Sequence, residues 1–303
     1  MKFGLCLPTR NAGPSLQKLL DSIHAQKTRP FKFLVVDSSS EDGTVLACRK
    51  AGAQVRVIPQ EKFNHGGTRW KAVGLLKGCP VVVFLTQDAV LADPGALGRL
   101  LQAFRDPQVG VAYGRQLPHP HSGLFGAHAR LFNYPEVSSV KTLQDVPRLG
   151  IKTAFTSNSF AAYRVTALRS VGGFASDVIL SEDMCAAGRM ILAGWKVAYV
   201  AEARVYHSHD YSPTEEFKRY FDIGVLHARE PWILRSFGTA EGEGKRFVLS
   251  EIRYLASRAP WLLPMIGVRT AFKWAGYRLG ILENRIPLSW KRRWSMNRSY
   301  WRS

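Results

Sequence analysis

The stretch Phe31-Lys-Phe-Leu-Val-Val-Asp37-Ser-Ser-Ser-Glu-Asp42-Gly-Thr44 decides the fold class of this chain. Its first part, Phe31–Val36, is apolar and rich in β-branched residues, as in a buried strand, and it ends on Asp37. A serine-rich loop then leads into a helix that we expect over Gly43–Ala51. A buried strand followed by a polar loop and a helix is the repeating unit of an α/β fold with a parallel sheet.

The same unit recurs along the chain on both sides of this stretch. Further strands are expected at Lys2–Leu7, Val55–Ile58, Val81–Leu85, Asn158–Arg164 and Val197–Val205. Helices are expected at Ser15–Gln26, Thr68–Lys77 and Ser181–Leu192, the last with Ser181 as its N-cap. The sequence therefore predicts an α/β fold with a mixed, mostly parallel sheet flanked by helices.

Two regions depart from this pattern. Residues 115–156 are irregular and carry several prolines, so we interpret them as a long crossover or a loop region. After Ser212 the chain becomes helical in character and rich in Trp and Arg. We therefore expect a main α/β domain over 1–212, with halves at about 1–114 and 115–212, and a basic helical C-terminal extension over 213–303.

Composition excludes some classes of protein and leaves others open. Among 303 residues, 46% are hydrophobic and 21% charged, so a disordered or fibrous chain is excluded. The net charge of +19 indicates an anionic partner, which nucleic acid, anionic lipid or a phosphorylated substrate would satisfy.

The four cysteines form no C-x-x-C pair and are expected to be buried free thiols. No signal peptide or spanning segment is apparent, so we expect a soluble or peripheral cytoplasmic protein.

Polar residues follow the expected strands at their carboxyl ends, where α/β sheets bind ligands. Pro8-Thr9-Arg10, Asp37 and Asp88 all occupy such positions. A carboxylate such as Asp37 can accept hydrogen bonds from a ribose or a base edge, whereas Asp42, five residues later, is more simply a turn residue. Asp88 can hold Mg²⁺ or Mn²⁺ together with the two phosphates of a nucleotide sugar, although a surface loop residue is the simpler alternative.

Three further stretches carry candidate chemistry, each with a purely structural alternative. In Phe63-Asn-His-Gly-Gly-Thr-Arg69, glycines permit close backbone approach and an arginine follows, which suits a diphosphate. Glu182-Asp183 at a helix start offers a general base, or merely an acidic helix N-terminus. His207-Ser-His209 after a strand can ligate a metal or contact a phosphate.

These residues, in this order, resemble family 2 inverting glycosyltransferases with the GT-A fold. The resemblance rests on Pro8-Thr9-Arg10-Asn11, Asp37-x-x-Ser-x-Asp42-Gly-Thr, the acidic strand end at Asp88 and the pair Glu182-Asp183. The stretches 63–69, 86–89 and 205–212 resemble the bacterial rhamnosyltransferase subgroup more specifically. The resemblance covers about residues 1–212.

The resemblance implies transfer of L-rhamnose from dTDP-β-L-rhamnose to a bacterial surface glycan, such as lipopolysaccharide core or O-antigen. It implies donor binding by Pro8, Thr9, Arg10, Asn11, Asp37, Asn64, His65, Gly66, Arg69, Gln87 and Asp88. Asp183 would be the catalytic base, with Glu182 orienting it or the acceptor. Asp88 and His207, with His209 as a further candidate, would bind the divalent cation, Mg²⁺ or Mn²⁺.

One departure from the family pattern concerns the metal. The family's DxD motif reads Thr86-Gln87-Asp88 here, so its first carboxylate is absent. The cation would then be held loosely, or Arg69 and His207 would share the neutralisation of the diphosphate.

Other interpretations of the sequence stay open. A UDP- or GDP-sugar donor would fit the same fold. A nucleic-acid-binding protein would fit the net charge, but no helix-turn-helix, zinc-finger or RNP signature is present, so we expect no nucleic-acid partner. From Tyr254 onward there are ten Lys and Arg and one Glu. This tail would suit an anionic membrane surface, or would simply pack on the catalytic domain.

Overall fold

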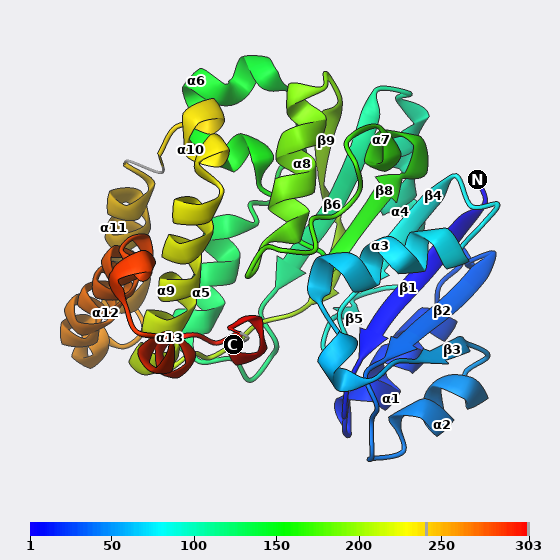
Figure 1. Cartoon of the computed structure of the whole chain (residues 1–303), viewed down its shortest axis with the longest axis horizontal. Helices are drawn as coiled ribbons and strands as arrows, with labels where there is room; N and C mark the ends of the chain where they lie inside the picture. Colours follow the sequence, from blue (N-terminus) through cyan, green and yellow to red (C-terminus); the bar gives the residue numbers. More distant parts are fainter. Residues whose placement is uncertain (240–241, 302–303) are drawn as a thin grey trace.

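The computed structural model of the chain describes residues 1–239 and 242–301. In this described part, one nine-stranded sheet runs in the order β3-β2-β1-β4-β8-β6-β9-β5, and β7 pairs with β9 beside that path (Figure 1). The strands are β1 (Phe3–Thr9), β2 (Lys32–Asp37), β3 (Gln54–Val57), β4 (Val81–Leu85), β5 (Val90–Leu91), β6 (Val109–Leu117), β7 (Ser139–Lys141), β8 (Phe160–Arg164) and β9 (Lys196–Tyr206). The expected α/β class with a mixed sheet is confirmed.

The first half of the sheet is parallel. β1 pairs with β2 and β4, and β2 pairs with β3, all in the same direction. Thr9 is in register with Asp37, so the carboxyl ends of β1 and β2 meet at one edge. β4 is buried along its whole length, because helices cover the sheet on both faces.

The second half of the sheet reverses direction. β8 runs antiparallel to both β4 and β6, and Leu85 at the end of β4 faces Phe160 at the start of β8. β9 runs parallel to β6, and its last residue Tyr206 faces Leu117 and Val90. The segment before β8 and the segment after β9 therefore lie beside the residues that follow β4.

Helices form a layer on each face of the sheet, and further helices follow in the C-terminal part. They are α1 (Ser15–His24), α2 (Thr44–Lys50), α3 (His65–Leu75), α4 (Ala96–Gln102), α5 (Leu124–Asn133), α6 (Val146–Leu149), α7 (Val165–Ser170), α8 (Glu182–Leu192), α9 (Pro213–Arg229), α10 (Pro231–Phe237), α11 (Glu243–Ala256), α12 (Leu263–Ile281) and α13 (Leu288–Trp294). α1, α2 and α4 contribute to one buried apolar cluster, and α3, α7 and α8 to the cluster on the other face. All four cysteines are free and buried, as expected.

Three expectations about local structure were wrong. Residues 115–156 are not one loop region, because β6 continues to Leu117 and α5, β7 and α6 follow it. α3 begins at His65 rather than Thr68, because the Asn64 side chain accepts a hydrogen bond from the Gly67 N–H and caps the helix. Ser181 does precede α8, but it adopts a left-handed conformation and its side chain makes no capping hydrogen bond.

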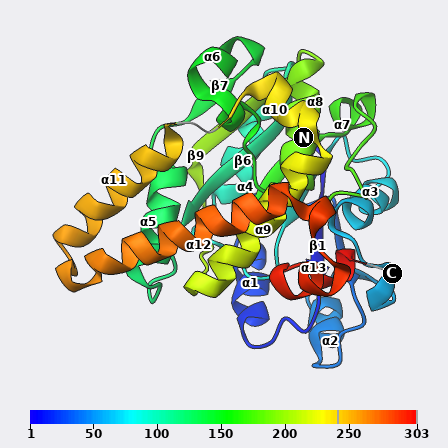
Figure 2. The ribbon, with the colours of Figure 1, turned by 60° about the vertical axis from the view of Figure 1, so that its left-hand side comes forward.

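The chain after Ser212 is helical, as the sequence predicts. α9 begins with a capping box between Ser212 and Glu215. α12 lies directly on α9, since a Cβ at Gly276 or Gly280 would lie within 2.2 Å of a backbone carbonyl oxygen of α9. α11 and α12 form a hairpin at one edge of the molecule (Figure 2). Among the described residues, no helix combines the length and the apolar character that crossing a bilayer requires.

Candidate functional site

A cavity of about 310 Å³ opens at the carboxyl ends of β1 and β4. Its walls are formed by Pro8, Thr9, Arg10, Ser38, Gln60, Phe63, His65, Arg69, Thr86, Gln87 and Ser299. This volume lies in the range of small-molecule sites. Six of the residues expected to bind the donor therefore share one cavity: Pro8, Thr9, Arg10, His65, Arg69 and Gln87.

Gln87, the middle residue of the Thr86-Gln87-Asp88 stretch, joins two strand ends. Its Oε1 accepts from the Arg10 backbone N–H at 2.8 Å, and its Nε2 donates to the Arg10 carbonyl oxygen at 3.1 Å. A carboxylate at position 87 could accept the first of these hydrogen bonds but could not donate the second. The amide is therefore matched to both backbone groups of Arg10, and it fixes the cavity floor between β1 and β4.

Asp37 and Asn11 hold the loops at the cavity edge by internal hydrogen bonds. Asp37 is fully buried, and it accepts from the Thr9 hydroxyl at 2.8 Å and from the hydroxyl and backbone N–H of Ser40. Asn11, with a positive φ, accepts from the Glu41 backbone N–H at 2.9 Å. Contact of either residue with a nucleoside stays a prediction, and for Asp37 it requires an exchange of these hydrogen bonds.

Asn64 and Gly66 attach α3 to the segment that precedes α8. The Asn64 side chain caps α3 and donates to the Ser176 carbonyl oxygen. A Cβ on Gly66 would lie 1.7 Å from the Ala175 carbonyl oxygen, so only glycine permits this approach. These contacts place the start of α3 against the loop that carries the acidic pair, and a role of either residue toward the donor stays a prediction.

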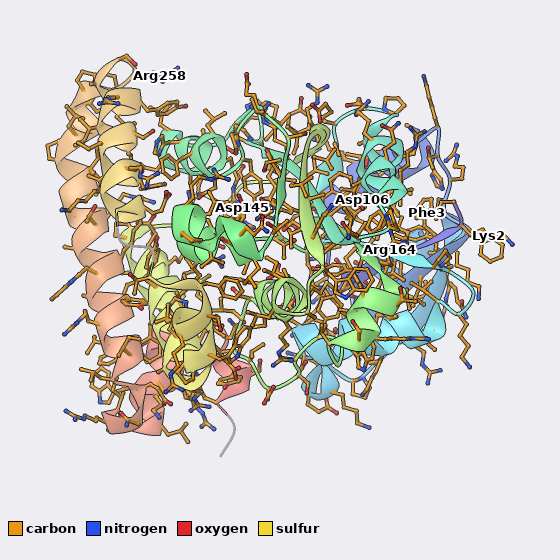
Figure 3. All side chains as sticks on the ribbon, turned by 90° about the horizontal axis from the view of Figure 1, so that it is seen from above. Lys2, Phe3, Asp106, Asp145, Arg164 and Arg258 are labelled. Atoms are coloured by element: carbon orange, nitrogen blue, oxygen red, sulfur yellow. The ribbon has the colours of Figure 1, made fainter. Side chains whose placement is uncertain are left out.

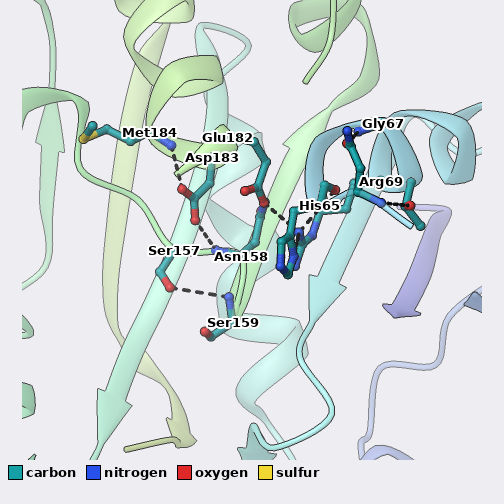
Figure 4. A network of polar contacts seen from close by, with 11 residues as sticks. His65, Gly67, Arg69, Ser157, Asn158, Ser159, Glu182, Asp183 and Met184 are labelled. Carbon is teal, nitrogen blue, oxygen red and sulfur yellow. Dashed lines mark hydrogen bonds and ion pairs between the residues drawn. The ribbon is translucent and has the colours of Figure 1, made fainter. Parts of the chain in front are cut away.

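The acidic pair lies at the N-terminus of α8, and its two carboxylates have different environments (Figure 4). Glu182 is buried, forms an ion pair with Arg69 at 2.7 Å and accepts from Asn158 Nδ2 at 2.9 Å. Burial opposes its ionisation, but the neighbouring charges of Arg69 and His65 hold the pKa of Glu182 below its usual value. Glu182 is therefore an ionised group whose Oε1 is held by both Arg69 and Asn158.

Asp183 is half-buried, and its pKa is shifted in the opposite direction to that of Glu182. Its oxygens accept from the backbone N–H groups of Asn158 at 2.9 Å and Met184 at 2.8 Å. Burial, together with the negative charge of Glu182, raises the pKa of Asp183 to about 6. A carboxylate with a pKa close to the working pH and a fixed orientation has the properties of a general base.

A second cluster lies where the residues after β4 meet the residues after β9. His207 Nε2 lies 3.3 Å and His209 Nε2 3.7 Å from Asp88 Oδ2, and the three ligand atoms lie within 4.8 Å of one another. Although burial opposes it, the hydrogen bond and charge of His207 hold the pKa of Asp88 below its usual range. Burial and the charge of His207 lower the pKa of His209 to about 4, so its imidazole is neutral at pH 7.

The surroundings of His207 fit a cation at this cluster. Its Nδ1 lies 2.9 Å from Gln116 Oε1, which also accepts from Arg130 Nη1 at 2.7 Å. An oxygen already accepting from arginine fixes the tautomer in which His207 Nδ1–H donates to it. When Nε2 gives up its own proton, its lone pair would face the Asp88 carboxylate, and a divalent cation held by both groups would take the place of that proton.

Sequence reasoning missed residues that the fold brings to the site from a distance. Asn158 contacts both members of the acidic pair, and Gln116 supports His207. Asn158 is the first residue of an expected strand, but the sequence does not indicate that this strand runs antiparallel and so brings Asn158 to the acidic pair. No signal in the sequence indicates that Ser299 lines the cavity.

Ser299 reaches the cavity because the C-terminal strap, residues 295–301, folds back over the molecule. The buried Asp222 carboxylate on α9 accepts from the backbone N–H groups of Met296 and Asn297. Tyr300 donates to the Asp177 carbonyl oxygen at 3.0 Å, and Trp301 is buried. The strap is thus tied both to α9 and to the loop before α8.

The chain is similar in sequence to known proteins. The model of the family described as Glycosyl transferase family 2 matches residues 5–172. The chain is 49% identical, over 99% of its length and 96% of the relative, to "O-antigen chain rhamnosyltransferase RfbN" of Salmonella typhimurium. It is 46% identical, over 99% of its length and 95% of the relative, to "O-antigen chain rhamnosyltransferase WbaN" of Salmonella anatum.

Solved structures share the fold at low sequence identity. A mannosyltransferase of Pyrobaculum calidifontis, in complex with GDP-Man and Mn²⁺, matches 99% of this chain and 84% of its own at 20% identity and a TM-score of 0.56. S. aureus TarS 1–349, in complex with UDP-GlcNAc, matches 94% and 92% at 18% identity and a TM-score of 0.53. These likenesses support the GT-A fold, and the family match with the two close relatives shows that the chain belongs to glycosyltransferase family 2.

Proposed function

We propose that this glycosyltransferase moves L-rhamnose from dTDP-β-L-rhamnose to a hydroxyl of an O-antigen glycan, with inversion at the anomeric carbon. The rhamnose donor is supported by two relatives that are 49% and 46% identical over 99% of the chain and are named as O-antigen chain rhamnosyltransferases. The observation that carries the chemistry is the environment of Asp183, a fixed carboxylate with a raised pKa of about 6.

In this proposal Asp183 is the general base. Its two backbone hydrogen bonds, from Asn158 and Met184, orient the carboxylate without consuming its capacity to accept a proton. Asp183 takes the proton of the acceptor hydroxyl while that oxygen attacks the anomeric carbon. The bond from the anomeric carbon to the dTDP oxygen breaks on the opposite face, and dTDP leaves with the electron pair.

Glu182 is a positioning residue in the same scheme. Its ion pair with Arg69 fixes the start of α8 against α3, and its negative charge helps to keep the pKa of Asp183 near 6. Arg69 also lines the cavity, so its positive charge lies near the expected diphosphate. Arg10 adds a second cation at the cavity wall.

Asp88, His207 and His209 would hold the divalent cation, Mg²⁺ or Mn²⁺. Such a cation, when bound, neutralises negative charge that develops on a leaving diphosphate. The contribution of the chain is to keep three ligand atoms within 4.8 Å and to fix the His207 ring through Gln116. The missing first carboxylate of the DxD motif is compensated in this proposal by the two histidines.

The acceptor in this proposal is a glycan or glycolipid on the cytoplasmic side of the membrane, and the enzyme works there as a peripheral protein. Residues 1–212 would form the catalytic domain, with the nucleotide-sugar half over about 1–114 and the acceptor half over 115–212. Residues 213–303 would form an extension that supports the site and approaches the membrane. No nucleic-acid partner is part of the scheme.

The decisive experiment is a donor screen of the purified protein with dTDP-rhamnose, UDP-sugars and GDP-sugars, using an extracted O-antigen oligosaccharide as acceptor. We expect transfer from dTDP-rhamnose, inhibition by dTDP, and an α-linked product by NMR. Transfer from a UDP- or GDP-sugar with none from dTDP-rhamnose would refute the donor assignment. The Asp183→Asn variant should bind dTDP like the unmodified protein and lose transfer by about 10³-fold or more.

A further inference from the structure

The outer side of the α11–α12 hairpin is an apolar surface without a partner in the described chain. We define the hairpin face by six exposed side chains: Leu249, Trp261, Met265, Val268, Phe272 and Trp274. Trp261 is 74% exposed and Trp274 66% exposed, although tryptophan side chains are on average mostly buried in folded proteins. An apolar groove between the two helices, lined by Val248, Thr270 and Trp274 among others, continues this surface.

α12 has a side that packs on the protein and, adjoining it, a stripe of exposed apolar residues. One side packs on α9, where Gly276 and Gly280 allow close backbone contact and Arg269 pairs with Glu216 at 2.9 Å. Met265, Val268 and Phe272 follow each other at spacings of three and four residues, which places them on one stripe. Because this stripe is exposed, it is not the side that secures the helix to the protein.

The charges around the hairpin face have one sign. Lys245, Arg253, Arg258 and Arg278 are exposed on the two helices and at the turn between them. Figure 3, which views the molecule from above, places Arg258 at one end of the hairpin. The two carboxylates between residues 244 and 301, Glu251 and Glu283, are both buried. The surface therefore combines tryptophan, aliphatic and basic side chains with no exposed acid from this segment.

We propose that the hairpin face docks onto an anionic phospholipid bilayer, with α12 lying in the plane of the interface. Tryptophan and arginine together favour the boundary between headgroups and acyl chains, and basic side chains attract anionic lipids. No described helix is able to cross the bilayer, so contact is confined to one leaflet. The absence of exposed carboxylates in this segment favours an anionic lipid surface over a protein partner of mixed charge.

This docking also orients the catalytic side of the molecule. α5 joins the hairpin to the site, because His128 on α5 contacts Ser250 on α11 at 2.9 Å. The Gly123 N–H, at the start of the same helix, donates to Asp210, one residue after His209. An acceptor anchored in the same membrane would then approach the site from the side that carries α5.

The test is co-sedimentation of the full chain with vesicles of phosphatidylcholine alone or with about one-quarter phosphatidylglycerol. We expect binding to the anionic vesicles only, weakened by about 0.5 M salt. A Trp261→Gln/Trp274→Gln variant and a Lys245→Gln/Arg253→Gln variant should each lose about tenfold in partition coefficient. A Leu46→Gln/Val137→Gln control, which changes exposed apolar residues elsewhere, should bind like the unmodified protein.

Two outcomes would overturn the proposal. Equal pelleting of the hairpin variants and the control would show that this face does not bind lipid. Self-association in sedimentation velocity that the tryptophan variant abolishes, without vesicle binding by the unmodified protein, would assign the face to a second copy of the chain. The measurement uses no donor, so its failure is independent of the proposed rhamnosyl transfer. Transfer to a lipid-free oligosaccharide should be equal in all three variants.

Discussion

Replacing Glu182 with Gln tests both the stability and the electrostatics of the acidic pair. The side chains of Arg69 and Glu182 are 4% and 7% exposed, so the substitution leaves a buried guanidinium without its counter-ion. Removing one partner of a buried pair costs roughly 3–5 kcal/mol, and the amide still accepts from Asn158, so we expect about 3 kcal/mol. With an unfolding entropy of about 2 cal/mol/K per residue, Tm falls by about 5 °C near pH 7.

The loss in stability has a defined pH dependence. The pKa of Glu182 is lowered in the folded protein, so its contribution is present above the pKa of the unfolded chain and is lost as the pH falls through the folded value. The difference in Tm between the variant and the unmodified protein should therefore shrink in acid. Thermal unfolding followed by circular dichroism at several pH values measures it.

The same substitution should change the pH profile of activity. Burial is the larger cause of the raised pKa of Asp183 and the charge of Glu182 the second, so Gln at 182 lowers that pKa in part. The acid limb of kcat/KM, expected near pH 6, should move down by roughly one pH unit. An unchanged acid limb of kcat/KM in a folded and active variant would refute the claim that the charge of Glu182 raises the pKa of Asp183.

Two further variants separate the ion pair from general damage. Glu136→Gln removes a carboxylate that pairs with Arg115 but is 82% exposed, and it should change Tm by less than about 1 °C. An Arg69→Met/Glu182→Met double variant removes both charges, and it should be more stable than Arg69→Met alone. If the loss in unfolding free energy of the double variant equals the sum of the losses in the two single variants, Arg69 and Glu182 are not energetically coupled.

Three other variants test separate features of the fold and the site. Gly66→Ala should lower the free energy of unfolding by roughly 1–3 kcal/mol, because its Cβ meets the Ala175 carbonyl oxygen. Gly74→Ala, in the same helix, meets nothing within 4 Å and should be neutral or stabilising. Equal urea midpoints of the two variants would contradict this packing. Burial raises the pKa of Asp222 to about 6, so its favourable contribution to stability is full in acid and is lost as the pH rises from about 4 through 6. Asp222→Asn should therefore gain in Tm relative to the unmodified protein from about pH 4 to 7 and level off above that; a constant difference would argue against an ionisable Asp222. Asp88→Asn and His209→Asn should each weaken Mn²⁺ binding in calorimetry by about tenfold or more, and unchanged affinity in both would remove the cluster from the metal assignment.

The strand ends of the parallel half could be predicted from the sequence, because β1, β2 and β4 are short apolar runs bounded by polar residues. Pro8, Thr9, Arg10 and Gln87 share one cavity for this reason, and His65 and Arg69 of α3 join them there. The antiparallel insertion of β8 could not be predicted, since pairing direction is set by tertiary contacts and not by composition. The proximity of Asn158 to the acidic pair depends on that reversal.

The sequence does not indicate which side chains have partners far along the chain. It predicts that Arg69 lies near the diphosphate, but not that it pairs with Glu182, 113 positions away. Residues 115–156 contain α5, which prolines and histidines on its N-terminal side obscure. Ser299 belongs to the cavity only because hydrogen bonds to Asp222 and burial of Trp301 bring the strap back.

The contact between α3 and the start of α8 limits how this protein can be recombined with its relatives. The Arg69–Glu182 pair and the approach of Gly66 to Ala175 join a helix of the nucleotide-sugar half to the segment that carries the base. An exchange of N-terminal halves would separate these partners, whatever crossover point is chosen between residues 75 and 174. Chimeric enzymes with new donor preference should therefore carry α3 and the 174–183 segment from the same parent.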